Sequence, residues 1–164
     1  MRCGFEIPKP KVFFKRLDPR AVIPEYKTPG AAGFDLATLT DVLIRAGEVT
    51  AVKTGLAVML PIDTEMQIRP RSGMSVCMSE LSIANSPGTI DSDYRGEIKI
   101  LIKHSGERDV LLPAGMRIAQ AIIAPVIRCD LVELAELSKT ERGEGGFGST
   151  GMLVETMAVT EALQ

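Results

Sequence analysis

The apolar residues of this 164-residue chain occur in short runs that turn-forming residues interrupt every few positions. Its 15 glycines and 10 prolines stand mainly between the runs, where they end helices and strands and favour turns. Runs of roughly four to eight residues are too short for most helices but match the usual length of strands. This punctuation predicts an all-β domain, built as a barrel or a jelly roll.

One run shows the alternation of a strand most clearly. In Glu97–His104, Ile98, Ile100 and Ile102 alternate with lysines and a leucine, which is the two-residue period of a sheet with one buried face. His104, the only histidine, is interpreted as a surface residue of this strand. The other predicted strands lie in residues 12–17, 34–39, 42–47, 56–60, 65–70, 109–113 and 120–127.

Two segments do not follow the strand pattern. Arg71–Glu80 predicts one short helix, because Met74 and Met78 share a face at helical spacing. Asp130–Thr140 leaves strand and helix open, since its apolar residues fit both periods.

Charge and cysteine usage limit the partners and the compartment. The 19 basic and 21 acidic residues give a net charge of −2, so the chain has no basic surface with which to bind nucleic acid. Cys3, Cys77 and Cys129 are an odd number at wide spacing, which predicts reduced cysteines that serve as small apolar fillers. The polar, proline-containing N-terminus is no signal peptide, and no apolar stretch reaches the roughly 20 residues of a membrane helix. We therefore expect a cytoplasmic protein with no membrane contact.

A glycine-rich segment near the C-terminus carries the spacing G-x-G-x-x-G in Gly143, Gly145 and Gly148. A dinucleotide-binding motif needs a strand before these glycines and a helix after them, in a unit of about 30 residues. Only 13 residues follow Gly151, and the preceding segment is polar. A Walker A loop is excluded as well, because no lysine follows Gly148.

The same segment still has the chemistry of an anion-binding loop. Glycines allow backbone N–H groups to surround an anion, and Arg142, Ser149 and Thr150 add further donors. Phe147 stands alone among the glycines. A glycine-rich tail without fixed structure is the alternative interpretation.

Four further segments carry polar groups that suit catalysis, each with a plainer alternative. Arg69–Gly73 suggests an anion site at a helix start or a serine N-cap beside surface arginines. Asn85–Glu97 suggests a tight hairpin that presents Asp91 as a base or metal ligand, or a solvated polar turn. Asp35 lies inside an apolar run, as do Arg117 and Gln120 in Met116–Ile123, where an edge position would explain the last two. A single histidine excludes a zinc cluster and a serine–histidine pair.

Taken in order, five segments resemble the five motifs of the trimeric dUTP diphosphatases, the dUTPase family. They are Ala31–Leu36, Arg69–Ser75, Gly88–Glu97, Gly115–Gln120 and Arg142–Gly151. The resemblance implies a distorted all-β jelly-roll barrel with one short helix, assembled as a homotrimer whose active sites lie between subunits. It also implies Mg²⁺-dependent hydrolysis of dUTP to dUMP and pyrophosphate, which limits uracil in DNA and supplies dUMP for dTMP synthesis.

The resemblance also implies roles for single residues. Asp91 would activate the water that attacks the α-phosphorus, and Asp35 would hold Mg²⁺ through water. Tyr94 would lie against the deoxyribose and leave no space for a 2′-hydroxyl. Residues assigned to the phosphate chain are Arg71, Ser72, Gly73 and Gln120, and residues assigned to uracil are Asn85, Thr89, Ile90 and Lys99.

In this family the C-terminal arm closes over the active site, so the resemblance divides the chain into three segments. Residues 1–139 would form the β-barrel domain, 140–151 the flexible arm and 152–164 an extension of unknown role. Phe147 would stack on uracil, while Arg142, Gly148, Ser149 and Thr150 would cover the γ-phosphate. Whether the arm closes in cis or in trans stays open.

Two alternative functions remain. A dCTP deaminase has the same fold, but it needs an acid/base carboxylate over the pyrimidine amino group, and the chain offers no matching motif near the hairpin. A nucleotide-sensing or protein-binding module on the same scaffold is the second, although the retained Asp35, Asp91 and Arg142 favour catalysis.

Overall fold

The computed structural model describes residues 9–149. Its strands are β1 (Phe13–Arg16), β2 (Phe34–Ala37), β3 (Val42–Ile44), β4 (Val49–Lys53), β5 (Leu56–Met59), β6 (Thr64–Arg69), β7 (Leu81–Ile83), β8 (Gly88–Ile90), β9 (Lys99–His104), β10 (Val110–Leu112) and β11 (Arg117–Pro125). Within these residues the only helix is α1 (Ser72–Cys77), which is far too short to cross a membrane. The predicted all-β fold with one short helix is confirmed.

Contacts divide the chain into two units, Met1–Arg128 and Cys129–Gln164. Every strand and the helix belong to the first unit, while residues 129–149 of the second form only turns and irregular backbone. Asp130–Thr140 is thus neither helix nor strand, and Leu131 and Leu137 in it are almost fully exposed. A short amphipathic segment gains regular structure mainly from packing, and this one buries no apolar side chain. The functional boundary after residue 139 stays a prediction.

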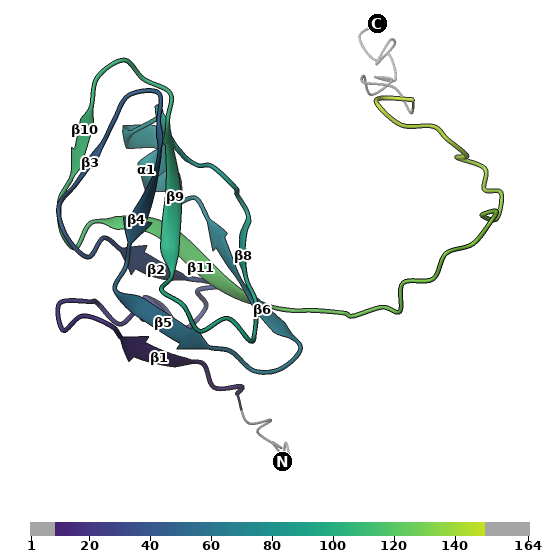
Figure 1. Ribbon diagram of the computed structural model, residues 1–164, viewed down its shortest axis with the longest axis horizontal. Coiled ribbons are helices and arrows are strands. Elements are labelled where there is room, and N and C mark those ends of the chain that lie inside the picture. The colour runs from purple at the N-terminus through teal and green to yellow at the C-terminus, as the bar shows by residue number, and fades with distance from the viewer. Residues whose placement is uncertain (1–8, 150–164) are drawn as a thin grey trace, which may run out of the picture. The chain divides into compact units, whose positions relative to one another are not determined.

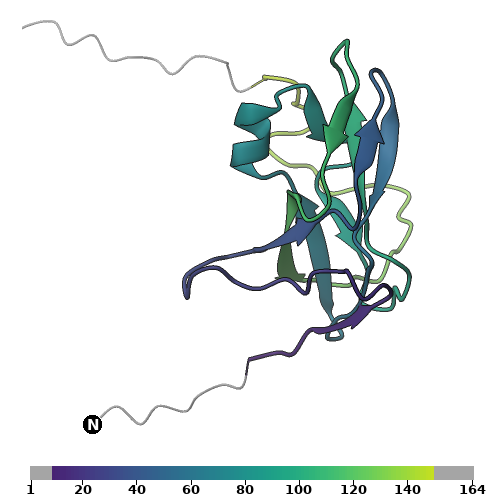
Figure 2. The same ribbon diagram turned by 90° about the vertical axis from the view of Figure 1, so that its left-hand side faces the viewer.

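Residues 9–128 of the first unit contain four sheets in which every strand pairing is antiparallel. They are the four-stranded sheet β2-β11-β6-β8, the three-stranded sheet β4-β9-β7, and the pairs β1-β5 and β10-β3. Figure 1 shows β1 and β5 at one end of this unit and β3 and β10 at the other. In Figure 2 the short helix α1 stands out on one side.

One apolar cluster joins the two larger sheets. Ile98, Ile100 and Ile102 are buried and their neighbours Lys99 and Lys103 are exposed, which confirms the alternation predicted for β9. The cluster also includes Leu36 of β2, Met66 of β6 and Ile118 and Ala121 of β11.

The interpretation of His104 as a surface residue is wrong. His104 is buried at the end of β9, in the same phase as the three isoleucines. Its Nδ1 accepts a hydrogen bond from the Gly106 N–H at 2.9 Å, and its Nε2 lies 2.7 Å from the Arg108 carbonyl. Because Nδ1 accepts, Nε2 carries the proton and donates, so both nitrogens of a neutral ring are satisfied.

The prediction that the cysteines fill the core is also wrong for the two that the structure describes, since Cys77 and Cys129 are exposed and free. Six residues of α1 make fewer than two turns, so the helix buries only Met74. Cys129 opens the irregular segment, and Cys3 lies outside the described residues.

Gly33, just before β2, allows β2 and β11 to approach closely. A Cβ there would lie 2.8 Å from the Ala121 carbonyl oxygen and 3.1 Å from Ile122 Cγ1. We expect Gly33→Ala to destabilise the protein by about 1–3 kcal/mol, because the clash involves backbone that cannot move alone. Thermal unfolding at fixed protein concentration measures this as a drop of about 2–4 °C per kcal/mol.

Gly30→Ala is the matched control, since a Cβ at Gly30 meets nothing within 4 Å. The free energy of unfolding should change by no more than about 0.5 kcal/mol, as for an ordinary surface substitution, so the Tm should stay close to that of wild type. Equal melting temperatures for the two variants would contradict the close approach of β2 and β11.

Candidate active site

In the described part of the chain, Asp35 of β2 forms ion pairs with two arginines. Arg71 Nε donates to Asp35 Oδ1 at 2.8 Å, and an Arg117 guanidinium nitrogen donates to Oδ2 at 3.0 Å. A terminal nitrogen of Arg71 also donates to the Arg117 carbonyl at 2.8 Å. Three segments far apart in the sequence, at β2, at the start of α1 and at the start of β11, thus meet at one carboxylate.

This group, the Asp35 cluster of Asp35, Arg71 and Arg117, carries more positive than negative charge. Two guanidinium groups face one carboxylate, and their remaining N–H donors are free for a further acceptor. The side chains of Asp35, Arg71 and Arg117 are 19%, 25% and 52% exposed, so a ligand from solvent can reach them. A partly desolvated arginine pair with an excess positive charge suits a phosphate.

Gln120 lies beside this cluster because of the sheet register. It pairs with Asp35 on β2 and with Arg69 on β6, so the three residues form one row across the sheet. Its Nε2 donates to the Pro70 carbonyl at 2.7 Å. A cavity of about 500 Å³ opens here, lined by Arg69, Pro70, Ser72, Ser75, Ser86, Pro87 and Gln120.

The helix start differs from the serine-cap alternative. Arg71 is the N-cap in extended conformation, it makes no side-chain cap hydrogen bond, and Ser72 is already the first helical residue. Ser72 and Gly73 are exposed, and a Cβ at Gly73 would meet nothing within 4 Å. Ser72 lines the cavity and Gly73 follows it in the helix.

Asp91 and Tyr94 lie on a second constellation, the turn that follows β8. The Tyr94 N–H donates to the Asp91 carbonyl at 3.1 Å, and Tyr94 Oη donates to the Glu97 carbonyl at 3.0 Å. The predicted tight hairpin is wrong, because β8 pairs with β6 whereas β9 pairs with β4 and β7. The turn carries the chain from one sheet to another.

The Asp91 side chain is exposed and accepts no hydrogen bond from residues 9–149. Asn85 lies close to Gly88, where a Cβ would meet its Nδ2 at 3.1 Å, while Thr89 pairs with Gln67. Ile90 is half-buried at the end of β8, and exposed Lys99 begins β9 in the other sheet. In residues 9–149, no hydrogen bond or ion pair links the Asp91 turn to the Asp35 cluster.

The arm segment has local turn structure of its own. Arg142 Nε donates to the Gly145 carbonyl at 2.9 Å, and the Ser149 N–H donates to the Gly146 carbonyl at 2.9 Å. Phe147 is fully exposed and has a positive φ of 49°, which is uncommon for a bulky residue. Gly148 has a φ of 92°. Thr150 and the extension 152–164 lie outside the described residues.

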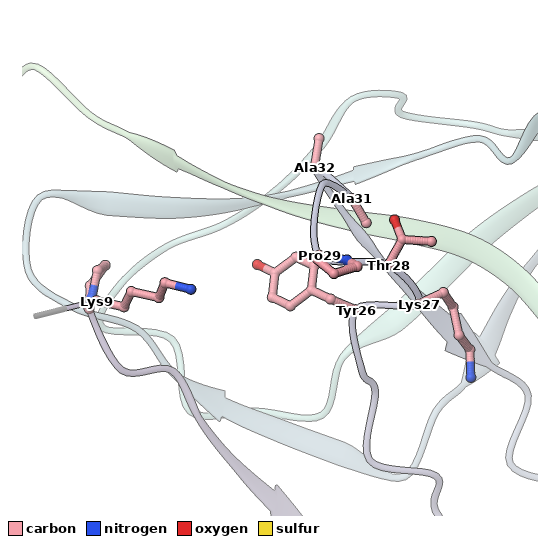
Figure 3. Close-up of a pocket in the computed structure, with 8 residues that line it drawn as sticks. Lys9, Tyr26, Lys27, Thr28, Pro29, Ala31 and Ala32 are labelled. Atoms are coloured by element: carbon pink, nitrogen blue, oxygen red, sulfur yellow. The ribbon is translucent and has the colours of Figure 1, made fainter. Parts of the chain in front are cut away.

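A second cavity, of about 610 Å³, is less suited to a charged ligand. It is lined by Lys9, Pro10, Tyr26, Lys27, Thr28, Pro29, Ala31 and Ala32 (Figure 3). The ammonium group of Lys27 forms an ion pair with Glu25, and the figure shows it turned away from Tyr26. The other polar side-chain groups of its lining are the Lys9 amine and the hydroxyls of Thr28 and Tyr26, and the Tyr26 ring packs edge-on against Phe34. Lys9 is thus the one positive charge of the lining that is not paired in the described chain.

No three acidic, histidine or cysteine side chains in the described chain could together hold a metal ion. A magnesium ion that keeps its water and is bound mostly by substrate phosphates needs only one nearby carboxylate. Asp35 fits that role, because each of its oxygens accepts one hydrogen bond and keeps a second lone pair.

The sequence indicates roles for Asp35, Arg71 and Gln120, whereas Arg117 stands in the same apolar run as Gln120 without an assigned role. In a regular strand, residues three apart point to opposite faces, so the strand pattern alone does not place Arg117 and Gln120 at one site. The register shifts between Arg117 and Ala119, and such a bulge redirects the arginine towards Asp35. An arginine close to a glutamine in an apolar run was the only signal.

Comparison with known proteins gives one consistent result. The family model described as dUTPase matches residues 20–151. A deoxyuridine 5'-triphosphate nucleotidohydrolase of Nautilia profundicola is 50% identical over 141 residues, which cover 86% of this chain and 99% of that protein. Its counterpart in Crocosphaera subtropica is 47% identical over 84% of this chain and 96% of its own length.

Solved structures agree with the sequences. A dUTPase variant of Staphylococcus bacteriophage 80alpha with dUpNHpp has a TM-score of 0.78 and 29% identity, covering 87% of this chain and 99% of its own. A dUTPase variant from phage phi11 of S. aureus, described as revealing the coordination of a structural Mg(II) ion, has a TM-score of 0.69 at 24% identity over 77% of this chain and 97% of its own.

Proposed function

Because this chain belongs to the dUTPase family, we infer that it hydrolyses dUTP to dUMP and pyrophosphate. The observation that carries the inference is the 50% identity to a dUTP nucleotidohydrolase across 86% of the chain. The Asp35 cluster supports it independently, since the chain has a solvent-accessible arginine pair that suits a phosphate.

In the proposed binding mode the triphosphate lies along the cavity beside α1. Arg71 offers the guanidinium N–H groups that Asp35 leaves free, and Ser72 and Gly73 offer hydroxyl and backbone donors. Gln120 is held by the Pro70 carbonyl and reaches the phosphates through water. These fixed donors would stabilise the charge that develops as the phosphoanhydride bond breaks.

Asp91 is the proposed general base. A carboxylate with no partner in the described chain is free to hydrogen-bond a water and take its proton during attack on the α-phosphorus. The proposed role depends on alignment, because the water must be held against a bound electrophile.

Mg²⁺ is the proposed cofactor, and Asp35 would hold it through water. When bound, the ion neutralises phosphate charge and orients the triphosphate. The two arginines of the Asp35 cluster hold the carboxylate in one orientation, so a hydrated ion would meet a fixed acceptor.

We propose further that the chain acts as a homotrimer. The chain belongs to the dUTPase family, whose active sites lie between subunits, and this supports a site completed by a neighbouring subunit. The arm would then close the site, with Phe147 on uracil and Arg142, Gly148, Ser149 and Thr150 over the γ-phosphate. Free, exposed Cys77 and Cys129 are consistent with a reducing cytoplasm.

Selection of the nucleoside is assigned to the β8 region. Asn85, the backbone of Thr89 and Ile90, and the start of β9 at Lys99 would pair with the uracil edge. Tyr94 would occupy the space of a 2′-hydroxyl, so that a ribonucleotide is rejected by contact.

A pyrophosphate-release assay with dUTP, dTTP, dCTP and UTP tests the function. We expect strong release from dUTP alone, with loss on removal of Mg²⁺ by EDTA and recovery when Mg²⁺ is added back. Ammonia release from dCTP would identify a deaminase instead, and nucleotide binding without any turnover would identify a sensing module.

A further inference from the structure

Gly96, two residues after Tyr94, lies directly beneath the tyrosine ring. A Cβ on Gly96 would be 2.4 Å from Tyr94 Oη, 2.6 Å from Cζ and 3.0 Å from Cε2. Distances below about 3 Å are repulsive for carbon, since the optimum contact is near 3.5–4.0 Å. The ring therefore occupies the space that any other side chain at this position would need.

The conflict at Gly96 concerns the ring and not the backbone. Gly96 is absent from the residues with positive φ in the described chain, so its conformation is open to an L-amino acid. Only atoms of Tyr94 lie among the three nearest to the added Cβ. Glycine is needed here for the space it leaves, in contrast to Gly148, where φ is 92°.

The turn beneath the ring is held in place from both sides. The Arg95 guanidinium donates to the carbonyls of Ser92 and Tyr94, each at 2.8 Å. Glu97 Oε1 accepts from the Gly55 N–H at 2.9 Å, between β4 and β5. Because these bonds hold the backbone on both sides of Gly96, a Cβ is accommodated by moving the ring.

Tyr94 is itself oriented by this arrangement. Its hydroxyl donates to the Glu97 carbonyl at 3.0 Å, across Gly96, and the side chain remains 42% exposed. One part of the ring thus packs on the turn while another part faces solvent, where a ligand can contact it. A tyrosine packed on a glycine and bonded at its tip has little freedom to tilt.

We propose that Gly96 is a specificity-determining positioning residue, which sets the selection between 2′-deoxyribose and ribose by fixing the height of the Tyr94 ring above the turn. The proposal rests on the proposed function, in which Tyr94 lies against the sugar. Gly96 touches no substrate and acts only through Tyr94.

The test compares kcat/KM for dUTP and UTP in the full-length protein. Gly96→Ala should lower the dUTP-to-UTP ratio by about tenfold or more, the scale that one misplaced group changes in a shaped pocket. Gly30→Ala, with open space around its Cβ, should leave the ratio unchanged. A Gly96→Ala ratio equal to that of wild type overturns the proposal.

A second pair of variants separates the ring from general disturbance of the turn. Tyr94→Ala and the double variant Tyr94→Ala/Gly96→Ala should have the same dUTP-to-UTP ratio, because the three atoms nearest to the added methyl group all belong to the ring that Tyr94→Ala removes. A further change in this ratio caused by the alanine at position 96 in this background overturns the proposal, even if Gly96→Ala alone fails to fold.

The wild-type protein distinguishes failure of the role of Tyr94 from failure of the role of Gly96. If wild type does not prefer dUTP over UTP, both the proposed role of Tyr94 and that of Gly96 are rejected. If wild type prefers dUTP and Gly96→Ala has the same dUTP-to-UTP ratio of kcat/KM, only the role of Gly96 is rejected.

Discussion

Replacing Asp91 with asparagine is expected to lower kcat for dUTP hydrolysis by about 10²–10⁴-fold, the usual contribution of a general base, while nucleotide affinity stays near that of wild type. The amide has almost the same shape but cannot take a proton from water. The Asp91 side chain accepts no hydrogen bond from residues 9–149, so the substitution should cost the fold little. Pyrophosphate release gives kcat, and titration with a non-hydrolysable dUTP analogue gives the affinity.

Asp93→Asn provides the matched control for Asp91→Asn. Asp93 is an exposed aspartate in the same turn, so the change in charge is identical and the position differs by two residues. We expect turnover close to wild type for this variant. Near-normal turnover of Asp91→Asn, or an equal loss in both variants, would reject Asp91 as the base.

Ending the chain after Glu141 is the second large expected effect, a fall in kcat/KM for dUTP of at least about 10²–10³-fold. That is the loss seen when one fixed donor to a transition-state oxygen is removed, and the truncation takes away several proposed donors together with Phe147. The buried apolar cluster ends before this segment, so we expect unchanged assembly in analytical ultracentrifugation. Steady-state kinetics on the truncated and complete chains measure the difference.

A chain that ends after Gly151 is the control for this truncation. It keeps the arm and lacks only residues 152–164, so it separates the arm from the extension. We expect its kcat/KM to remain close to that of the complete chain. If the chain that ends after Glu141 dissociates into monomers, the arm is structural, which would contradict its proposed role as a lid.

The secondary structure could be predicted where apolar residues form a distinct run between turn residues. β9 was predicted in full because its isoleucines alternate with lysines, and the three-residue strands β3 and β10 lie in predicted runs, whereas β4, β7 and β8 lie in none. Extending the β9 alternation by one step would have placed His104 inside. The turn after β8 was predicted, but sequence alone does not say that its flanking strands pair elsewhere, because pairing is a long-range property.

The sequence predicted which residue types make up the candidate site and their order along the chain, but not how they are arranged in space. Asp35 and Arg71 are charged residues within recognisable motifs, so both were candidates from the sequence. Arg117 depends on a bulge that redirects one side chain, and Gly96 depends on space that a neighbouring ring fills. Such features depend on where other parts of the chain lie, and a local pattern does not contain that information.

The carboxylate between Arg71 and Arg117 has a consequence for phosphate binding. Two guanidinium groups held side by side would repel each other, and Asp35 supplies the negative charge that holds both of them at one place. Because contacts within the chain position these arginines, a phosphate need not gather scattered side chains at an entropic cost.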